Sequence, residues 1–220
     1  MKDDVTQQIL TAAGELFAEH GYRETTVRDI CKRAKVNVSA VNYYFGDKER
    51  LYVQAVKNAR LQMERRVPLP EWDAATPPEQ KLRQFVETMI RRMLISEGSS
   101  WQTRLLTREI MEPTRACEEM VQESFLPFFQ LLLGIVRELS AANWPDHKIE
   151  KIGMSIISQI VHYRAQDRIV ELLIGSNQLQ QHYRPHDLVN HITEFTLAAL
   201  HAMRQADQPS FDRTASSSPN

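Results

Sequence analysis

The sequence predicts an all-α protein, and three observations carry this expectation. Apolar residues recur at steps of three and four along most of the 220 residues, which places them on one face of a helix. No segment alternates apolar and polar residues as a half-buried strand would. Residues that begin or end helices, such as Asn37 and Gly46, stand between the periodic segments. We therefore expect helices joined by short connections, with a small domain before a larger one.

The first third of the chain reads as four helices. The first carries apolar residues at helical spacing and ends at Gly21. Thr25 or Thr26 can cap the second, because a side-chain oxygen there satisfies amide donors of the first helical turn. Asn37 can cap the third in the same way, and Gly46 ends it. The expected helices span residues 4–20, 27–34, 38–45 and 48–67.

Prolines mark the clearest break in the chain, because proline cannot continue a helix and also restricts the residue before it. We therefore place a linker over residues 68–77. Pro127 and Gly134 are expected to bend the helix that contains them. Later helices are expected over residues 78–96, 101–111, 114–142, 146–174 and 185–204. The expected division is a first domain over 1–67, the linker, a second domain over 78–204 and a disordered tail over 205–220.

The composition favours a globular protein, with 42% hydrophobic and 25% charged residues. Cys31 and Cys117 are too few for a disulfide scaffold, so we expect free thiols in a reducing compartment. The most apolar stretch, residues 125–136, is shorter than the ~20 residues that span a bilayer. The opening residues MKDDVTQQIL do not resemble a signal peptide. We expect a cytoplasmic protein that has no membrane partner.

The patterns of common enzymes are missing from the sequence. It contains no HExxH, P-loop, GxGxxG or GxSxG motif, so no enzymatic template can be assembled. The histidines His182, His186 and His191 do not share one helical face at a metal-binding spacing, and Pro185 separates the first two. We expect no catalytic residues, no metal site and no cofactor.

Charge is distributed unevenly along the chain, although the net charge is only −1. Residues 1–66 contain 12 lysines and arginines against 9 acidic residues, whereas residues 67–220 contain 15 against 19. The basic part also contains the two short helices over 27–34 and 38–45, which are joined by a tight turn. This is the helix-turn-helix arrangement, whose second helix enters the major groove of DNA. We therefore expect double-stranded DNA as a partner.

The second short helix presents a solvent side that suits base contacts, because Val41 and Phe45 point back into a three-helix core. An asparagine can bond a base edge, and a valine can contact a thymine methyl group. The expected base-reading residues are Val38, Ser39, Asn42 and Tyr43. The expected phosphate-positioning residues at the margins of this helix are Thr26, Arg28, Tyr44 and Lys48.

The segments TTVRDICKRAKV, residues 25–36, and VNYYFGDKERL, residues 41–51, resemble the helix-turn-helix of the TetR family of transcriptional regulators. The resemblance covers residues 5–56. It implies that the marginal residues named above hold the DNA backbone and that the solvent-side residues read bases. The sequence departs from the family pattern at Ser39, where glycine or another small residue is common, and at Asn42, where tyrosine is common.

The later segment REIMEPTRA, residues 108–116, is similar to the CecR-like subgroup of that family, as are the phenylalanine-rich residues 125–129. Within the first of these segments, Glu109, Glu112 and Arg115 suit a buried charged site for a ligand. The alternative is that Glu112 pairs on the surface with the arginine one turn earlier.

Methionine and aromatic residues of the second part supply an adaptable apolar set, which suits either core packing or an effector cavity. Polar residues on the 146–174 helix could orient a ligand or satisfy a dimer contact. The candidate cavity residues are Met89, Met93, Trp101, Leu105, Met120, Phe125, Phe128, Phe129, Gln159, His162 and Tyr163. We expect a hydrophobic or amphipathic small-molecule effector.

The last two expected helices carry apolar stripes that suit a subunit interface. Two such helices from each subunit form a four-helix interface, which is also the arrangement that the TetR resemblance implies. Ordinary core helices of a monomer are the alternative. The candidate interface residues are Ile152, Ile156, Ile160, Leu188, Ile192, Phe195, Ala199 and Met203.

Together these features predict a sequence-specific regulator, a ligand-released repressor that binds an inverted-repeat operator as a homodimer. A ligand between the helices of residues 78–174 would tilt the helix from Lys48 and change the separation of the two reading helices. The alternative is a non-specific architectural DNA-binding protein without an effector. An all-α enzyme is a further alternative, without a recognisable pair of nucleophile and base.

Overall fold

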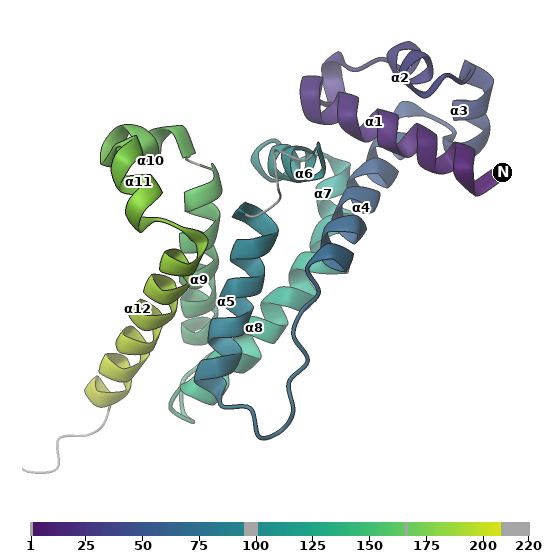
Figure 1. Ribbon diagram of the computed structural model, residues 1–220. Helices are drawn as coiled ribbons and strands as arrows, with labels where there is room; N and C mark the ends of the chain where they lie inside the picture. The colour runs from purple at the N-terminus through teal and green to yellow at the C-terminus, as the bar shows by residue number, and fades with distance from the viewer. Residues whose placement is uncertain (1, 95–100, 166, 208–220) are drawn as a thin grey trace, which may run out of the picture.

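The computed structural model describes residues 2–94, 101–165 and 167–207, and every regular element in these ranges is a helix (Figure 1). The N-terminal helices are α1 (Lys2–Glu24), α2 (Val27–Ala34), α3 (Val38–Phe45) and α4 (Lys48–Arg66). The later elements are α5 (Pro78–Leu94), α6 (Trp101–Met111), α7 (Arg115–Met120), the π-helical segment η1 (Val121–Phe125), α8 (Leu126–Leu139), α9 (Asp146–Ala165), α10 (Asp167–Ile174), α11 (Ser176–His182) and α12 (Pro185–Ala206). The all-α prediction is confirmed.

Caps and glycines set the ends of the first helices. Gly21, at φ 79° and ψ 172°, leaves helical geometry within α1, so the regular part of that helix ends there. The Thr26 hydroxyl caps α2 by accepting from the Asp29 backbone N–H at 3.2 Å. The Asn37 side chain caps α3 by accepting from the Ala40 backbone N–H at 2.8 Å. Helices α2 and α3 consequently span the predicted residues.

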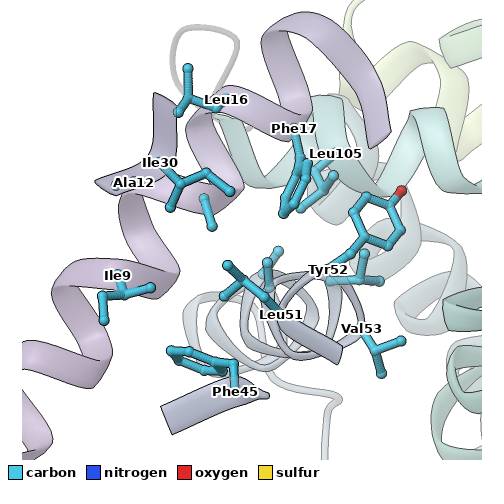
Figure 2. Packing of buried hydrophobic residues seen from close by; sticks show 14 of the residues in the cluster. Ile9, Ala12, Leu16, Phe17, Ile30, Phe45, Leu51, Tyr52, Val53 and Leu105 are labelled. Carbon is cyan, nitrogen blue, oxygen red and sulfur yellow. The ribbon is translucent and has the colours of Figure 1, made fainter. Parts of the chain in front are cut away.

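Two hydrophobic cores hold the helices together. The first, shown in Figure 2, contains the fully buried side chains of Phe17 from α1, Ile30 from α2 and Leu51 from α4. It also contains Leu105 from α6 and Met120 from α7. The four N-terminal helices therefore share their core with two helices from the second part of the chain.

The second core lies among α5, α8, α9 and α12, which lie next to one another in Figure 1. Phe85, Leu132, Ile156 and Ile192 are fully buried within it. The connection between α4 and α5 is not helical, as the prolines predict, yet it packs against this core. There, the Nε1 of Trp72 donates to the Gln84 side chain at 2.6 Å, which ties the linker to α5.

The expected helix over 114–142 is divided into α7, η1 and α8. Pro127, in the first turn of α8, has no N–H to donate to the carbonyl four residues earlier, and its ring crowds that carbonyl. The five residues before α8 wind as a π-helix, which accommodates the missing bond within a continuous helical path. The expected bend at Pro127 is therefore a local change of winding.

Three other boundaries differ from expectation. The helix expected over 146–174 consists of α9 and α10. The short α11 was not predicted, because it buries no residue and its sequence has no apolar stripe. Helix α12 continues to Ala206, inside the expected tail. The rest of that tail, residues 208–220, lies outside the described residues, as do the last two residues of the expected 78–96 helix.

Within the described ranges, one continuous helical stretch, Arg115–Leu139, has the length and apolar composition that a membrane crossing requires. It is longer than the apolar stretch 125–136 that the sequence indicated, because η1 joins α7 to α8. Its buried residues Leu132 and Val136 belong to the second core. Packing within the protein thus accounts for part of its apolar surface.

A glycine allows α6 to approach α1. A Cβ atom at Gly14 would lie 2.1 Å from Cζ3 of Trp101, a distance that carbon atoms do not adopt, so the indole of Trp101 packs where a side chain would stand. Trp101 was expected to line the effector cavity. It packs instead against α1 and the first core, because Gly14 leaves space for it there.

We predict that Gly14→Ala lowers the free energy of unfolding by about 1–3 kcal/mol, because the added methyl group overpacks the α1–α6 contact. Gly134→Ala is the matched control, since no heavy atom lies within 4 Å of a Cβ at Gly134. That control should be stabilising by up to about 1 kcal/mol, because alanine favours a helix over glycine. Urea unfolding of both variants checks the prediction, and a Gly14→Ala protein as stable as Gly134→Ala would contradict it.

Candidate functional site

Helix α3 exposes the face that the sequence predicts to read bases. Tyr43 is 73% exposed and Val38 is 44% exposed, and Ser39 and Asn42 are exposed beside them. The opposite face of α3 places Val41, which is fully buried, in the first core. The exposed face therefore carries a hydroxyl, an amide, a phenol and an aliphatic group that suit contacts with base edges.

The four predicted phosphate-positioning residues differ in how free their polar groups are. Thr26 and Arg28 are exposed, but the Thr26 hydroxyl donates to Oδ2 of Asp29 at 2.5 Å while it caps α2. This hydrogen bond lowers the pKa of Asp29. Tyr44 is half-buried, with its ring 5.1 Å from that of Tyr43 in an edge-to-face arrangement.

Lys48, at the start of α4, is fixed against the end of α1. Its Nζ donates to the Arg23 carbonyl at 3.2 Å and lies 4.6 Å from the centre of the Tyr22 ring. An ammonium group has three N–H donors, so the carbonyl engages one of them and the group can still approach a phosphate. The structure thus holds this cation at the margin of the α3 face.

A cavity of about 410 Å³ lies between the two parts of the molecule, with walls from α4, α5, α6, α7, η1, α8 and α9. This size is within the range of small-molecule pockets. Six methionines line it: Met63, Met89, Met93, Met111, Met120 and Met154. Its aromatic walls come from Phe125, Phe128 and Phe129. Met111, Met154 and Phe125 are also exposed to solvent, so the cavity has an apolar rim.

Six of the predicted cavity residues line this space: Met89, Met93, Met120, Phe125, Phe128 and Phe129. Five do not, and the first two of these, Trp101 and Leu105, pack into the first core. Gln159 and His162 lie on another side of α9, where His162 is exposed. Tyr163 packs against the second core with its ring 6.2 Å from that of Tyr183. Helical spacing alone did not separate the faces of α6 and α9.

Charged groups form a network where α4 meets η1 at the cavity. Arg60 is 9% exposed, and its guanidinium donates to Glu64 at 2.9 Å and to Glu123 at 3.0 Å. The Ser124 hydroxyl donates to Glu64 at 2.5 Å, and the Lys57 Nζ donates to Glu123 at 2.6 Å. The Lys57 hydrogen bond is the main cause that lowers the pKa of Glu123. The network fixes η1 to α4.

Arg92 of α5 is a second buried cation on the cavity wall. It is 6% exposed, its Nε donates to the Val67 carbonyl at 2.9 Å, and its Cζ lies 4.6 Å from the centre of the Phe128 ring. Burial lowers the pKa of Arg92, and the charge of Glu64 opposes this effect. Sequence reasoning missed both arginines, because their spacing does not distinguish a wall position from a solvent position.

A buried carboxylate joins α4 to the corner between α6 and α7. Glu109 is fully buried and accepts from the Tyr52 hydroxyl at 2.6 Å and from the Thr114 backbone N–H at 2.7 Å. The Thr114 hydroxyl also donates to it at 2.9 Å and caps α7. No basic side chain of the described residues forms an ion pair with Glu109, so these three donors compensate its burial. Burial and this contact raise the pKa of Tyr52.

Neither sequence interpretation of the 108–116 segment describes Glu109. It does not line the described cavity, and its partners are Tyr52 and Thr114. The alternative pairs Glu112 with Arg108, and no such ion pair forms among the described residues. Glu112 and Arg115 are exposed, and the nearest carboxylate oxygen to Arg115 is that of Glu49 at 3.7 Å. The buried charged ligand site proposed for this segment is therefore wrong, because its members face different directions.

The predicted interface residues divide into two groups. Ile156, Ile160, Leu188 and Ile192 are buried inside the second core, so they cannot contact a partner, and this part of the prediction is wrong. The apolar stripes pack against α5 and α8, which periodicity could not reveal. Ile152 and Met203 are half-buried against the same core, whereas Phe195, at 59% exposed, and Ala199 face solvent.

Comparison with known proteins gives two family matches. The model for bacterial regulatory proteins of the tetR family matches residues 9–55, which comprise most of α1, all of α2 and α3 and the first part of α4. The model for the C-terminal domain of the HTH-type transcriptional dual regulator CecR matches residues 78–200, more than half of the chain. The second match contains most of the cavity wall and the second core.

Individual relatives agree with these matches. The chain is 24% identical over 184 residues to the HTH-type transcriptional dual regulator CecR of Shigella flexneri, covering 79% of this chain and 81% of that protein. A TetR-like transcriptional regulator from Rhodococcus sp. RHA1 has a TM-score of 0.63 at 17% identity, covering 90% and 96% of the two chains. NalD, the secondary repressor of the MexAB-OprM multidrug efflux pump in Pseudomonas aeruginosa, has a TM-score of 0.59 at 21% identity, covering 90% and 98%. These structures share the fold.

We predict that Glu109→Gln lowers the free energy of unfolding by about 1–3 kcal/mol. The new amide N–H₂ would face donors, because the Thr114 backbone N–H cannot accept a hydrogen bond and the Tyr52 and Thr114 hydroxyls would have to rotate to do so. Glu112→Gln is the matched control, because Glu112 is exposed one turn away and should change stability by less than about 0.5 kcal/mol. Chemical denaturation measures both.

A double-mutant cycle with Tyr52→Phe separates the hydrogen bond from general packing. The coupling between Tyr52→Phe and Glu109→Gln should be at least about 0.5 kcal/mol, as for other contacting pairs. Equal stability of the Glu109→Gln and Glu112→Gln proteins would contradict the role assigned to Glu109.

Proposed function

The chain belongs to the TetR family of transcriptional regulators and carries a C-terminal domain of the CecR type, and from this premise we propose a ligand-released repressor that binds an inverted-repeat operator as a homodimer. It is a DNA-binding regulator and not an enzyme. In this proposal residues 1–67 read DNA, the 68–77 linker follows, and residues 78–204 bind the effector and the second subunit. The protein acts in the cytoplasm.

The observation that carries the proposal is the position of α4. Its N-terminal half contributes Leu51 and Val56 to the core beneath the reading helix, and its C-terminal half contributes Met63 and Glu64 to the cavity wall. A ligand that prefers one orientation of α4 would therefore favour one placement of α3. In a dimer, the two copies of α3 must fit half-sites ~34–36 Å apart, so a small rotation weakens binding.

The sign of regulation rests on the relatives. NalD is a repressor, and the CecR relative is a dual regulator. The cavity lies between the first core, beneath the DNA-reading helix, and the second core. A ligand that fills it would change the spacing of these two cores, which fits release of the protein from DNA by the ligand. We therefore assign repression in the free state and release in the bound state.

The dimer surface in this proposal is the exposed side of α9 and α12. On α12, Phe195 is exposed with Ala198 and Ala199 beside it, and small residues allow two helices to approach closely. On α10, which follows α9, Leu172 and Leu173 are 69% and 79% exposed and add further exposed apolar surface. A second copy of the chain would cover both.

The test of the function is selection of genomic fragments by the purified protein at ~150 mM salt, where purely electrostatic binding is weakened. We expect one inverted repeat to be enriched. Tyr43→Ala should lower affinity for that repeat by about five- to a hundredfold, the effect of losing a base contact worth about 1–3 kcal/mol. The exposed Gln80 of α5 lies outside the proposed DNA and dimer surfaces and provides the control Gln80→Ala, which should leave affinity unchanged. Uniform weak binding without enrichment would favour the architectural alternative.

The proposed dimer is tested by Phe195→Glu, which places a charge on the exposed side of α12 without disturbing the core. We expect the variant to sediment as a monomer and to lose most of its affinity for an inverted repeat, because single half-sites bind weakly. Gln8→Glu, an exposed substitution on α1 that adds the same charge, should remain a dimer. A Phe195→Glu protein with the sedimentation of the parent would contradict the assigned surface.

A further inference from the structure

Building on the proposed effector cavity, we infer that its ligand carries a carboxylate on an apolar body and that Arg92 binds this carboxylate. Arg92 reaches the cavity from α5, between the end of α4 and the Phe128 ring of α8.

The guanidinium of Arg92 is buried and forms no ion pair with a carboxylate of the described residues. A guanidinium has five N–H donors and stays charged in proteins. Among the described residues, the acceptor for Arg92 is the Val67 carbonyl, which takes the Nε–H at 2.9 Å, and no carboxylate forms an ion pair with the side chain. Contact with the Phe128 ring compensates the charge only in part. A buried cation in this state favours an added anion.

The other charged groups of the wall are already paired. Arg60 forms ion pairs with Glu64 at 2.9 Å and with Glu123. The Ser124 hydroxyl also donates a hydrogen bond to Glu64. Among the described residues that line the cavity, Arg60, Glu64 and Arg92 are charged, and their charges sum to +1. This surplus belongs to Arg92, because Arg60 is matched.

The remainder of the wall specifies the body of the ligand. Methionine, phenylalanine, leucine, isoleucine and valine make up 15 of the 21 described lining residues, so a molecule with polar groups along its length would lose hydrogen bonds to water on entry. A planar carboxylate can accept two parallel hydrogen bonds from one guanidinium, whereas an alcohol cannot and an ammonium is repelled. The matching ligand class is an aliphatic or aryl carboxylic acid.

The contact of Arg92 with Val67 connects this recognition to α4. Val67 is the C-cap residue that directly follows α4, and its carbonyl accepts a hydrogen bond from Arg92. A carboxylate that draws the guanidinium toward the cavity would change this contact at the same helix that carries Leu51 into the DNA-reading core. The ligand's charge therefore acts on the element that couples the cavity to α3.

Two matched probe series test the inference by calorimetry on the full chain without DNA. Octanoate, 1-octanol and octylammonium share one hydrocarbon chain, and 4-phenylbutyrate and 4-phenyl-1-butanol share one aryl body. We expect each carboxylate to bind about ten- to a hundredfold more tightly than its alcohol, the effect of one charge-assisted hydrogen-bond pair, and the ammonium to bind more weakly than either. Equal affinity of carboxylate and alcohol would overturn the inference.

Variants then locate the anion site. Arg92→Met should remove the preference for carboxylate while it keeps the affinity for the alcohols, and Arg92→Lys should keep part of the preference. Arg91→Met is the matched control, because Arg91 is exposed on the same helix and its loss changes the net charge equally. Circular dichroism shows whether each variant folds. If Arg92→Met does not fold, the Arg92→Lys protein and the head-group comparison in the parent decide the outcome.

The outcomes separate this inference from the function on which it rests. If all probes bind with equal affinity, the cavity binds apolar molecules and the inference about charge is wrong. If no probe binds, both the effector cavity and the inference are contradicted, whatever the result of the DNA selection. If carboxylates bind tightly to the parent and the Arg92→Met protein retains that preference, the anion lies elsewhere and the assignment to Arg92 is overturned.

Discussion

The arrangement depends on one constraint, which is that α4 belongs to two environments and must satisfy both. Its first turns complete the core beneath the reading helix, and its last turns form a wall of the cavity. The Tyr52 hydroxyl fixes its second turn to Glu109, a buried carboxylate that has no ion-pair partner among the described residues. Burial of that group is tolerated because three donors converge on it, and the same convergence holds α6, α7 and α4 in one relative position. Motion of α4 must work against these hydrogen bonds.

Helices α2 and α3 were predictable from the sequence to the residue, because their signals are local. Thr26, Asn37 and Gly46 act through backbone atoms within four positions of themselves, so their effect does not depend on the rest of the fold. The exposed face of α3 followed from the placement of Val41 and Phe45 in the core, which a short amphipathic helix makes unambiguous.

For the second part of the chain, the sequence predicted that the segments are helices but not which side of each helix faces the core. The spacing of Ile156 and Ile192 fits a subunit interface and a monomer core equally well. Only the positions of α5 and α8, which cover these residues, show that they belong to the core. Trp101 was assigned to the cavity because large aromatic residues line pockets, yet the absence of a side chain at Gly14, 87 positions earlier, determines where it packs. Arg92 acquires its importance from a partner outside its own helix, so no pattern along the chain identified it. The sequence marked Glu109 as a candidate buried charge, but its partner Tyr52 on α4 could not be inferred from the pattern.

The methionine-rich wall has a consequence for selectivity. Unbranched thioether side chains change rotamer at little cost, so such a wall can follow many molecular outlines and distinguishes poorly between apolar bodies of similar size. A single guanidinium fixed by the Val67 carbonyl and the Phe128 ring cannot adapt in this way, and its discrimination concerns charge. Selectivity would then be asymmetric, strict toward one functional group and permissive toward the scaffold that carries it. A regulator of this kind responds to a chemical class rather than to one compound.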